Sequence, residues 1–133
     1  MTLTCSMKIS IITVCFNSAT TIERTIQSVE DQTYSNIEYI IVDGNSNDET
    51  LKIIQSNELV VAKWISEPDK GLYDAMNKGI ALATGDVVGL INSDDLFCDN
   101  QAIEKVMRVF EDNPKLDSVY ADLYYVAKDN TDN

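Results

Sequence analysis

The stretch KISIITVCF, residues 8–16, decides the fold class of this chain of 133 residues. It is an almost continuous run of apolar and β-branched residues. A strand with one solvent-exposed face would instead alternate apolar and polar positions. Such a run is typical of a strand buried on both faces of a parallel sheet. Parallel strands need crossover segments, usually helices, between them. The sequence on the C-terminal side should therefore alternate between helices and strands.

The rest of the chain shows this alternation. Short apolar runs predict further strands, at residues 37–44, 60–66, 86–91 and 116–126. Between them, apolar residues recur every three or four positions, which predicts helices at residues 20–32, 46–57, 71–85 and 100–114. In the third helix we expect the inward face to consist of Tyr73, Met76, Ile80 and Ala83.

Local signals mark where these helices begin and end. A Ser or Thr followed three residues later by Glu predicts a capping box at the start of the first two, formed by Thr20 with Glu23 and by Ser46 with Glu49. Gly85 and Pro114 should end the third and fourth helices.

Repeated strand–helix units predict an α/β fold, a mostly parallel sheet with helices on both faces. The length suits one domain, and no linker or repeat marks an internal boundary. We therefore expect residues 1–133 to form a single domain with flexible ends at residues 1–7 and 127–133. Ligands of such sheets bind outside the carboxyl ends of the strands.

The composition excludes several classes of function. The formal net charge is −12, from 22 acidic and 10 basic residues, which argues against nucleic acid or an anionic membrane as partner. There is no histidine, so catalytic triads, Cys-His pairs and histidine-ligated metals are excluded within this chain. No signal peptide or apolar run of about 18 residues is present, and we expect a cytoplasmic protein. Its three cysteines, Cys5, Cys15 and Cys98, should then be reduced thiols.

Two adjacent acids, Asp94 and Asp95, follow the strand expected at residues 86–91. Neighbouring carboxylates repel each other unless a cation compensates. An all-oxygen ligand set suits Mg²⁺ or Mn²⁺, which commonly bind one or two carboxylates together with phosphate oxygens of a ligand. The pair therefore predicts metal-bridged binding of a diphosphate. The alternative is that the two acids cap the helix that begins near Gln101, or form a turn.

Three further strand-end residues have two interpretations each. Asp43 either accepts a hydrogen bond from a nucleotide base or forms an ordinary Asp-Gly turn. Phe16 either stacks on a base or belongs to the core. Lys70, just before a predicted helix, either contacts phosphate or is a solvated loop residue. No glycine-rich dinucleotide or P-loop motif is present.

Three stretches together resemble the N-terminal half of the family 2 glycosyltransferases: ISIITVCFN, TIERTIQSVEDQTYSNIEYIIVDGNSNDET and EPDKGLYDAMNKGIALATGDVVGLINSDD. The resemblance covers residues 8–112, and its specificity lies in the order and spacing of the motifs. It implies the GT-A fold, with a Rossmann-like nucleotide-binding half. It also implies an inverting transferase of the kind common in bacterial polysaccharide synthesis.

The resemblance also implies roles for single residues. Those expected to bind substrate, with Lys70 added from the argument above, are Val14, Phe16, Asn17, Asp43, Lys70, Asn77 and Asp94. Asp95, with Asp94, would hold the metal. Four residues depart from the family pattern, which bears on the identity of the donor nucleotide. Asn92 replaces a frequent Asp, Met76 a frequent Arg, and Val14-Cys15 a frequent Pro-Thr.

The implied reaction transfers a sugar from a nucleoside diphosphate donor, by family frequency a UDP-sugar, to a hydroxyl of a glycan or lipid-linked acceptor. Mn²⁺ or Mg²⁺ would be the cofactor. We expect the catalytic base, an Asp or Glu, in a second half beyond Asn133, so this chain should be an inactive donor-binding part. A lipid-linked acceptor would place the full-length protein against the inner face of the membrane. Nothing indicates an oligomeric state.

Three other functions stay open. A non-catalytic nucleotide-sugar-binding module would bind the donor without transfer. A nucleotidyltransferase would show a glycine-rich, basic loop after the first strand, which CFNSATT at residues 15–21 lacks. An acidic Ca²⁺ module would bind Ca²⁺ without any nucleotide.

Overall fold

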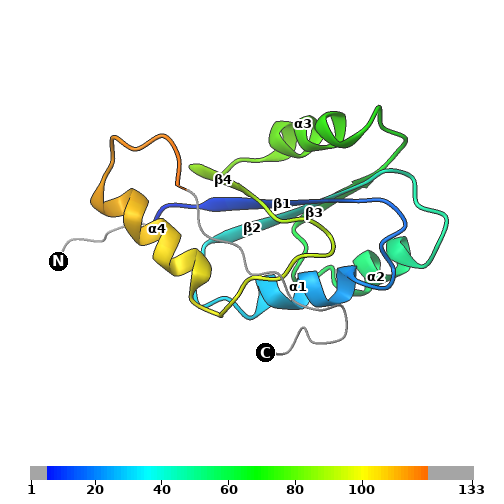
Figure 1. Ribbon diagram of the computed structural model, residues 1–133, viewed down its shortest axis with the longest axis horizontal. Coiled ribbons are helices and arrows are strands. Elements are labelled where there is room, and N and C mark those ends of the chain that lie inside the picture. The colour runs from blue at the N-terminus through cyan, green and yellow to red at the C-terminus, as the bar shows by residue number, and fades with distance from the viewer. Residues whose placement is uncertain (1–5, 120–133) are drawn as a thin grey trace.

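The structure is a computed structural model that describes residues 6–119. Strands and helices alternate along it (Figure 1), and their bounds are β1 Ile9–Cys15, α1 Ile22–Glu30, β2 Ile37–Asp43, α2 Thr50–Ser56, β3 Lys63–Ser66, α3 Leu72–Leu82, β4 Val87–Leu90 and α4 Ala102–Asp112. The predicted alternation is confirmed. The last predicted strand is not formed at residues 116–119, and residues 120–126 lie outside the described part.

The four strands form one sheet in the order β3-β2-β1-β4, and every neighbouring pair is parallel. The register aligns Cys15 of β1 with Asp43 of β2, and Asp43 with Ser66 of β3. The carboxyl ends of these three strands therefore lie side by side at one edge of the sheet. This confirms the predicted α/β class.

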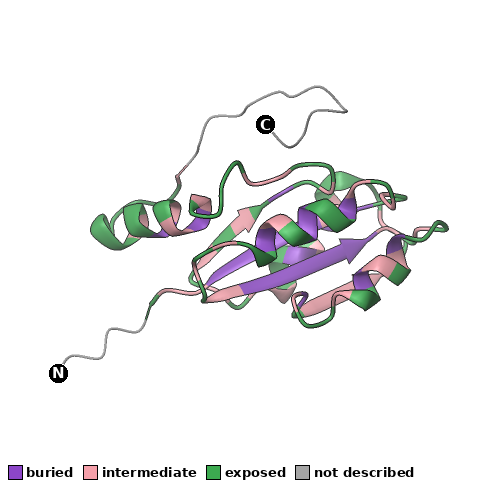
Figure 2. Cartoon of the chain, turned by 90° about the horizontal axis from the view of Figure 1, so that it is seen from below, coloured by how far each residue is buried: buried purple, intermediate pink, exposed green. Residues whose placement is uncertain are grey.

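Helices cover both faces of the sheet, as predicted (Figure 1). Helix α3 lies over one face and packs through Ala75 on Ile12, Ile40 and Val42. Helices α1, α2 and α4 bury the larger cluster on the other face. Figure 2 shows the buried residues concentrated on the central strands and on the inner sides of the helices. Because β1 is covered on both sides, its sequence is apolar at nearly every position.

The inward face of α3 differs from the prediction. Tyr73 is 80% exposed and Ile80 is 48% exposed, so both face away from the sheet. The buried residues of α3 are Ala75 and Gly79. The reason is close packing, because a Cβ on Gly79 would lie 2.5 Å from Cγ2 of Ile12. Small residues let the helix approach the sheet where larger ones would hold it off.

Replacing Gly79 with alanine should lower the free energy of unfolding by up to about 2 kcal/mol. The added methyl overpacks against Ile12, which costs about 1–3 kcal/mol, and alanine's better helix propensity offsets about 1 kcal/mol of this. Urea unfolding measures the difference. Ala81→Gly, at an exposed position of α3, measures the propensity contribution alone. An unchanged or raised stability would mean that α3 can shift away from Ile12 without cost.

The two predicted capping boxes are wrong. α1 begins after Thr21 and α2 after Glu49, and neither of these cap residues makes a side-chain capping bond. At α2 the carboxylate of Asp48 accepts the amide of Thr50 at 2.9 Å instead. Asp48 stands outside the Ser-x-x-Glu spacing that predicts a capping box.

Of the two predicted helix ends, the one at Pro114 is confirmed and the one at Gly85 is wrong. α3 already ends at Leu82, before Gly85. Gly85 instead allows a close approach, because a Cβ there would lie 2.7 Å from the amide nitrogen of Ser10. α4 ends at Asp112, two residues before Pro114, as predicted.

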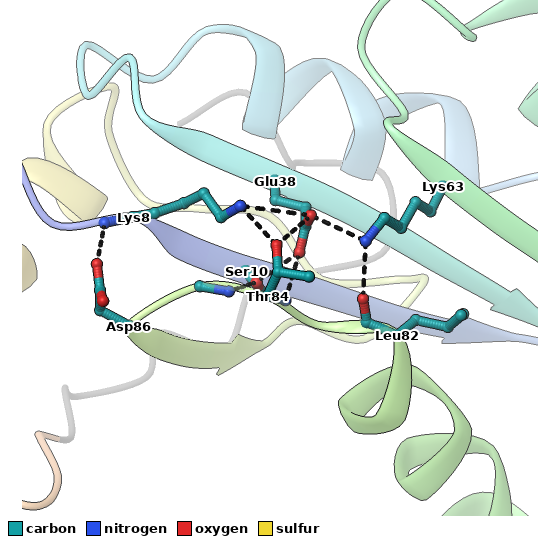
Figure 3. Close-up of polar contacts among 8 residues, drawn as sticks. Lys8, Ser10, Glu38, Lys63, Leu82, Thr84 and Asp86 are labelled. Carbon is teal, nitrogen blue, oxygen red and sulfur yellow. Dashed lines mark hydrogen bonds and ion pairs between the residues drawn. The ribbon is translucent and has the colours of Figure 1, made fainter.

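A buried carboxylate joins several elements at the amino ends of the strands (Figure 3). Glu38 of β2 is 8% exposed and accepts hydrogen bonds from the Ser10 hydroxyl at 2.8 Å and from the amide and hydroxyl of Thr84 at 2.9 and 2.8 Å. It also pairs with Lys63 at 3.1 Å and Lys8 at 3.7 Å. Burial alone would raise the pKa of Glu38, but these hydrogen bonds lower it to about 2.

No helix within residues 6–119 has the length and apolarity needed to cross a bilayer. Two of the three cysteines fall in this range, and both are free thiols, Cys15 buried and Cys98 exposed. The expectation of reduced thiols is met at these two positions, and Cys5 lies outside the described residues.

Candidate functional site at the carboxyl ends of the strands

The loops that follow β1 and β2 are hydrogen-bonded to each other. The Gly44 amide donates to the Cys15 carbonyl at 2.9 Å. The Asn17 amide donates to the Ser46 hydroxyl at 2.8 Å, and the Asn17 side chain accepts the Asn47 amide at 2.9 Å. Asn17 adopts a left-handed conformation with φ of 49°, which asparagine tolerates better than most residues. The two loops therefore form one continuous surface.

Asp43 lies at the centre of this surface and is fully buried. Its Oδ1 accepts hydrogen bonds from the Ser46 hydroxyl and, at 3.4 Å, from the Cys15 thiol. Its Oδ2 accepts the Ser46 amide at 2.9 Å and the Ser66 hydroxyl at 2.7 Å. Burial and the nearby carboxylate raise the pKa of Cys15, so the thiol stays protonated and donates. Asp43 thus holds together the ends of β1, β2 and β3.

Phe16 and Val14 take different positions at the end of β1. Phe16 is 61% exposed, so the interpretation of this residue as core is wrong. Val14 is half-buried and packs against the cluster under α3. The aromatic ring therefore stands at the exposed edge of the surface, where a planar ligand could stack on it.

The acidic pair lies in a turn directly after β4. The Asp95 amide donates to the Asn92 carbonyl at 3.1 Å, and the Asn92 side-chain amide donates to Asp95 Oδ2 at 3.0 Å. Both Asp94 and Asp95 are exposed. The pair does not cap α4, because Asp99 accepts the Gln101 amide at 2.8 Å near the start of that helix. Of the two structural alternatives, only the turn is therefore observed.

Two side chains outside the turn attach it to the rest of the site. The hydroxyls of Ser18 and Ser93 lie 2.9 Å apart, which joins the turn to the loop after β1. The Thr25 hydroxyl of α1 lies within hydrogen-bond distance of the carbonyls of Ser93 and Asp95, at 3.0 and 2.8 Å. Asn17 and the acidic turn are thereby brought to one side of the sheet. Neither Ser18 nor Thr25 was predicted, since nothing local to them points to a partner so far along the chain.

Lys70 and Asn77 lie on the loop after β3 and on α3, and both are exposed. The backbone amides near the start of α3 are already bound by acids of this chain. The Lys70 amide donates to Asp74 at 2.9 Å, and the Gly71 amide donates to Asp69 at 3.0 Å. Their roles in binding phosphate or sugar stay predictions.

Asp69 is a further residue of the site that the sequence did not single out. Its carboxylate lies so close to the end of β2 that a Cβ on Gly44 would be 2.7 Å from Oδ2. A glycine after Asp43 therefore leaves room for the loop that follows β3. The local sequence signal of this close approach is the Asp-Gly pair at residues 43–44.

The acidic turn offers carboxylate oxygens to a divalent cation, and the phosphate oxygens of a ligand could complete the coordination of that cation. Within residues 6–119 no group of three or more His, Cys, Asp or Glu side chains is assembled to hold a metal. Asp94 and Asp95 alone provide two exposed carboxylates. This is the ligand number with which Mg²⁺ commonly binds when phosphate oxygens supply the remaining positions.

The sequence model of glycosyl transferase family 2 matches residues 10–133. The chain belongs to this family. An uncharacterized glycosyltransferase of Mycobacterium tuberculosis is 43% identical over 96 residues, which are 71% of this chain and 37% of that protein. A PGL/p-HBAD biosynthesis glycosyltransferase of Mycobacterium bovis is 32% identical over 120 residues, which are 86% of this chain and 46% of that protein. This family 2 chain thus spans less than half the length of these curated relatives.

Solved glycosyltransferase structures share the fold. A mannosyltransferase from Pyrobaculum calidifontis, solved with GDP-Man and Mn²⁺, superposes with a TM-score of 0.75 at 22% identity, over 83% of this chain and 34% of that chain. TarS of S. aureus in complex with UDP-GlcNAc gives a TM-score of 0.74 at 22% identity, over 80% of this chain and 32% of that chain. The predicted membership in family 2 and the GT-A fold are confirmed.

Proposed function

We propose that this family 2 chain is the donor-binding part of a metal-dependent, inverting glycosyltransferase of bacterial cell-surface polysaccharide synthesis. The donor would be a nucleoside diphosphate sugar, with UDP the favoured nucleotide, and the acceptor a hydroxyl of a glycan or lipid-linked sugar. The observation that carries the proposal is the exposed Asp94–Asp95 turn beside the loops after β1 and β2. Structural neighbours solved with UDP-GlcNAc and with GDP-Man support a nucleotide sugar as the ligand class.

The nucleoside would bind over the ends of β1 and β2. The exposed ring of Phe16 suits stacking on a base, and Asn17 lies beside it in the chain. Asp43 already accepts two donors on each oxygen. A base N–H that binds Asp43 would therefore have to replace one of them, and the two serine hydroxyls can rotate away most easily. Val14 would shape the floor of the base site.

The diphosphate would bind at the acidic turn. Asp95 and Asp94 are the residues that would hold Mn²⁺ or Mg²⁺, and Asp94 would also contact the ribose. The bound cation would neutralise the charge that develops on the leaving diphosphate. Lys70 and Asn77, on the loop before α3 and on that helix, are proposed contacts to the phosphate and sugar.

The acceptor side of the reaction is proposed to lie outside these 133 residues. None of the residues assigned here is a base positioned for an acceptor hydroxyl. An Asp or Glu elsewhere in the full-length protein would remove the acceptor proton for in-line attack with inversion. We propose that the reaction takes place in the cytoplasm, at the inner face of the membrane if the acceptor is lipid-linked.

Calorimetric titration of the full-length protein with UDP, GDP and dTDP, each with Mn²⁺ and with EDTA, tests the donor site. We expect one nucleotide to bind, and to bind more tightly with Mn²⁺. Equal binding in EDTA would contradict the metal assignment, and no binding of any nucleotide would contradict the proposed function. Nucleotide binding without sugar transfer or donor hydrolysis would instead indicate a non-catalytic binding module. Ca²⁺ binding without nucleotide would indicate an acidic Ca²⁺ module.

A further inference from the structure

A single buried hydroxyl holds both sides of the acidic turn. Thr25, in the middle of α1, is fully buried. Its Oγ1 lies 3.0 Å from the Ser93 carbonyl and 2.8 Å from the Asp95 carbonyl. A hydroxyl has one proton to donate, so the two carbonyls share it. Because these carbonyls lie on either side of Asp94, Thr25 constrains the backbone that aims both carboxylates.

The direction of this hydroxyl is unusual for a helix. A threonine inside a helix commonly bonds back to a carbonyl of its own preceding turn. Thr25 instead reaches a loop nearly seventy residues further along the chain. The other contacts of the turn are formed by exposed or half-buried residues, namely Asn92 and Ser18. Thr25 is therefore its buried anchor.

Two more polar residues of α1 and its C-terminal end continue this attachment. The Ser28 hydroxyl accepts the Phe97 amide at 3.4 Å. The Gln32 side chain donates to the Asp99 carbonyl at 2.7 Å and accepts the Ile103 amide at 3.0 Å. The whole segment from the acidic turn to α4 is thus fastened to one side of α1, with Thr25 as the contact nearest the carboxylates.

We propose that Thr25 is a positioning residue for the cation site of the donor, which rests on the function proposed above. Two adjacent carboxylates repel each other, and an exposed turn would otherwise relax to separate them. Holding the turn in one conformation before the ligand arrives removes an ordering cost from binding. Residues that orient metal ligands commonly change metal affinity about 10–100-fold when they are replaced. Thr25 thereby sets the affinity for the cation–diphosphate pair without touching it.

The test replaces Thr25 in the full-length protein and measures binding of whichever of UDP, GDP and dTDP binds best, by calorimetry with Mn²⁺ and with EDTA. Thr25→Val keeps the shape and removes the hydroxyl. It should weaken binding with Mn²⁺ about tenfold and leave binding in EDTA unchanged. Thr25→Ser keeps the hydroxyl and should restore binding with Mn²⁺. Thr13→Val removes a buried hydroxyl that contacts Tyr39 at 2.7 Å, and it should bind as the wild type does.

Hydrogen exchange without ligand gives an independent readout. Thr25→Val should speed exchange of the Asp95 amide, which bonds across the turn to Asn92, and Thr13→Val should not. Equal weakening of binding with and without Mn²⁺, unchanged binding in Thr25→Val, or failure of Thr25→Ser to restore it would overturn the role of Thr25. Absence of metal-dependent binding in the wild type itself would overturn the proposed function, and this inference with it.

Discussion

Asp95→Asn in the full-length protein should weaken Mn²⁺-dependent nucleotide binding and sugar transfer by about 100-fold or more. Asparagine has nearly the shape of aspartate but carries no charge. A bound metal ion stabilises the developing charge by several kcal/mol, and removal of one of its ligands would forfeit much of this. Each 1.4 kcal/mol is a factor of about ten. Asp94 would be the one carboxylate left in the turn for the cation, because position 92 is an asparagine. Calorimetry with Mn²⁺ and with EDTA measures the effect on binding, and donor turnover measures the effect on transfer.

Asp112→Asn is the matched control for this experiment. Asp112 is an exposed aspartate at the end of α4, so the variant removes the same charge from the protein away from the turn. It should bind and react as the wild type does. If both variants lose binding equally, net charge rather than the turn would be responsible. If Asp95→Asn retains full metal dependence, Asp95 does not hold the cation.

Glu38→Ala should lower the free energy of unfolding by about 3 kcal/mol. Removing one member of a buried charged network leaves its partners without compensation, which typically costs about 3–5 kcal/mol. The lower end applies here because the side chains of Lys8 and Lys63 are 36% and 38% exposed and can turn to water. The fully buried hydroxyl of Ser10 would lose its acceptor, whereas Thr84 is exposed and can turn to water. Urea unfolding at neutral pH measures the loss.

The control for this variant is Glu49→Ala. Glu49 pairs with Lys52 at 3.1 Å, but the two side chains are 69% and 77% exposed. An exposed pair of this kind contributes less than about 1 kcal/mol. A similar loss for both variants would mean that Glu38 contributes no more than a surface ion pair.

The contribution of Glu38 should depend on pH with a defined sign. The pKa of Glu38 is about 2 in the folded chain, below its ordinary value of 4.5. The charged form is therefore favoured by folding, and its contribution is complete above about pH 4.5 and is lost as pH falls towards 2. Glu38→Gln resembles the protonated form. The difference in unfolding free energy between wild type and Glu38→Gln should shrink as pH is lowered through this range, and a constant difference would contradict the assignment.

The elements and the sheet could be predicted because their signals are local. The apolar run of β1 and the three-to-four-residue periodicity of α1 and α4 report which sides of each element are covered. The position of Asp94 and Asp95 after β4 follows from the same pattern, and parallel strands place their carboxyl ends at one edge. The inward face of α3 could not be predicted in this way. The large apolar residues of α3 were predicted to face the sheet, whereas Gly79 is the residue that packs against Ile12.

The sequence by itself determined the α/β class and the strand ends that carry polar residues, the acidic pair among them, because each depends on residues near one another in the chain. Only the tertiary structure decided which residues are hydrogen-bonded to each other at the site. Asp43 is enclosed by donors from three strand ends, and Thr25 supports a turn that follows β4. Such hydrogen bonds join residues far apart in sequence and depend on the direction of single side chains. The packing of the elements sets that direction, and a local pattern of residues does not predict this packing.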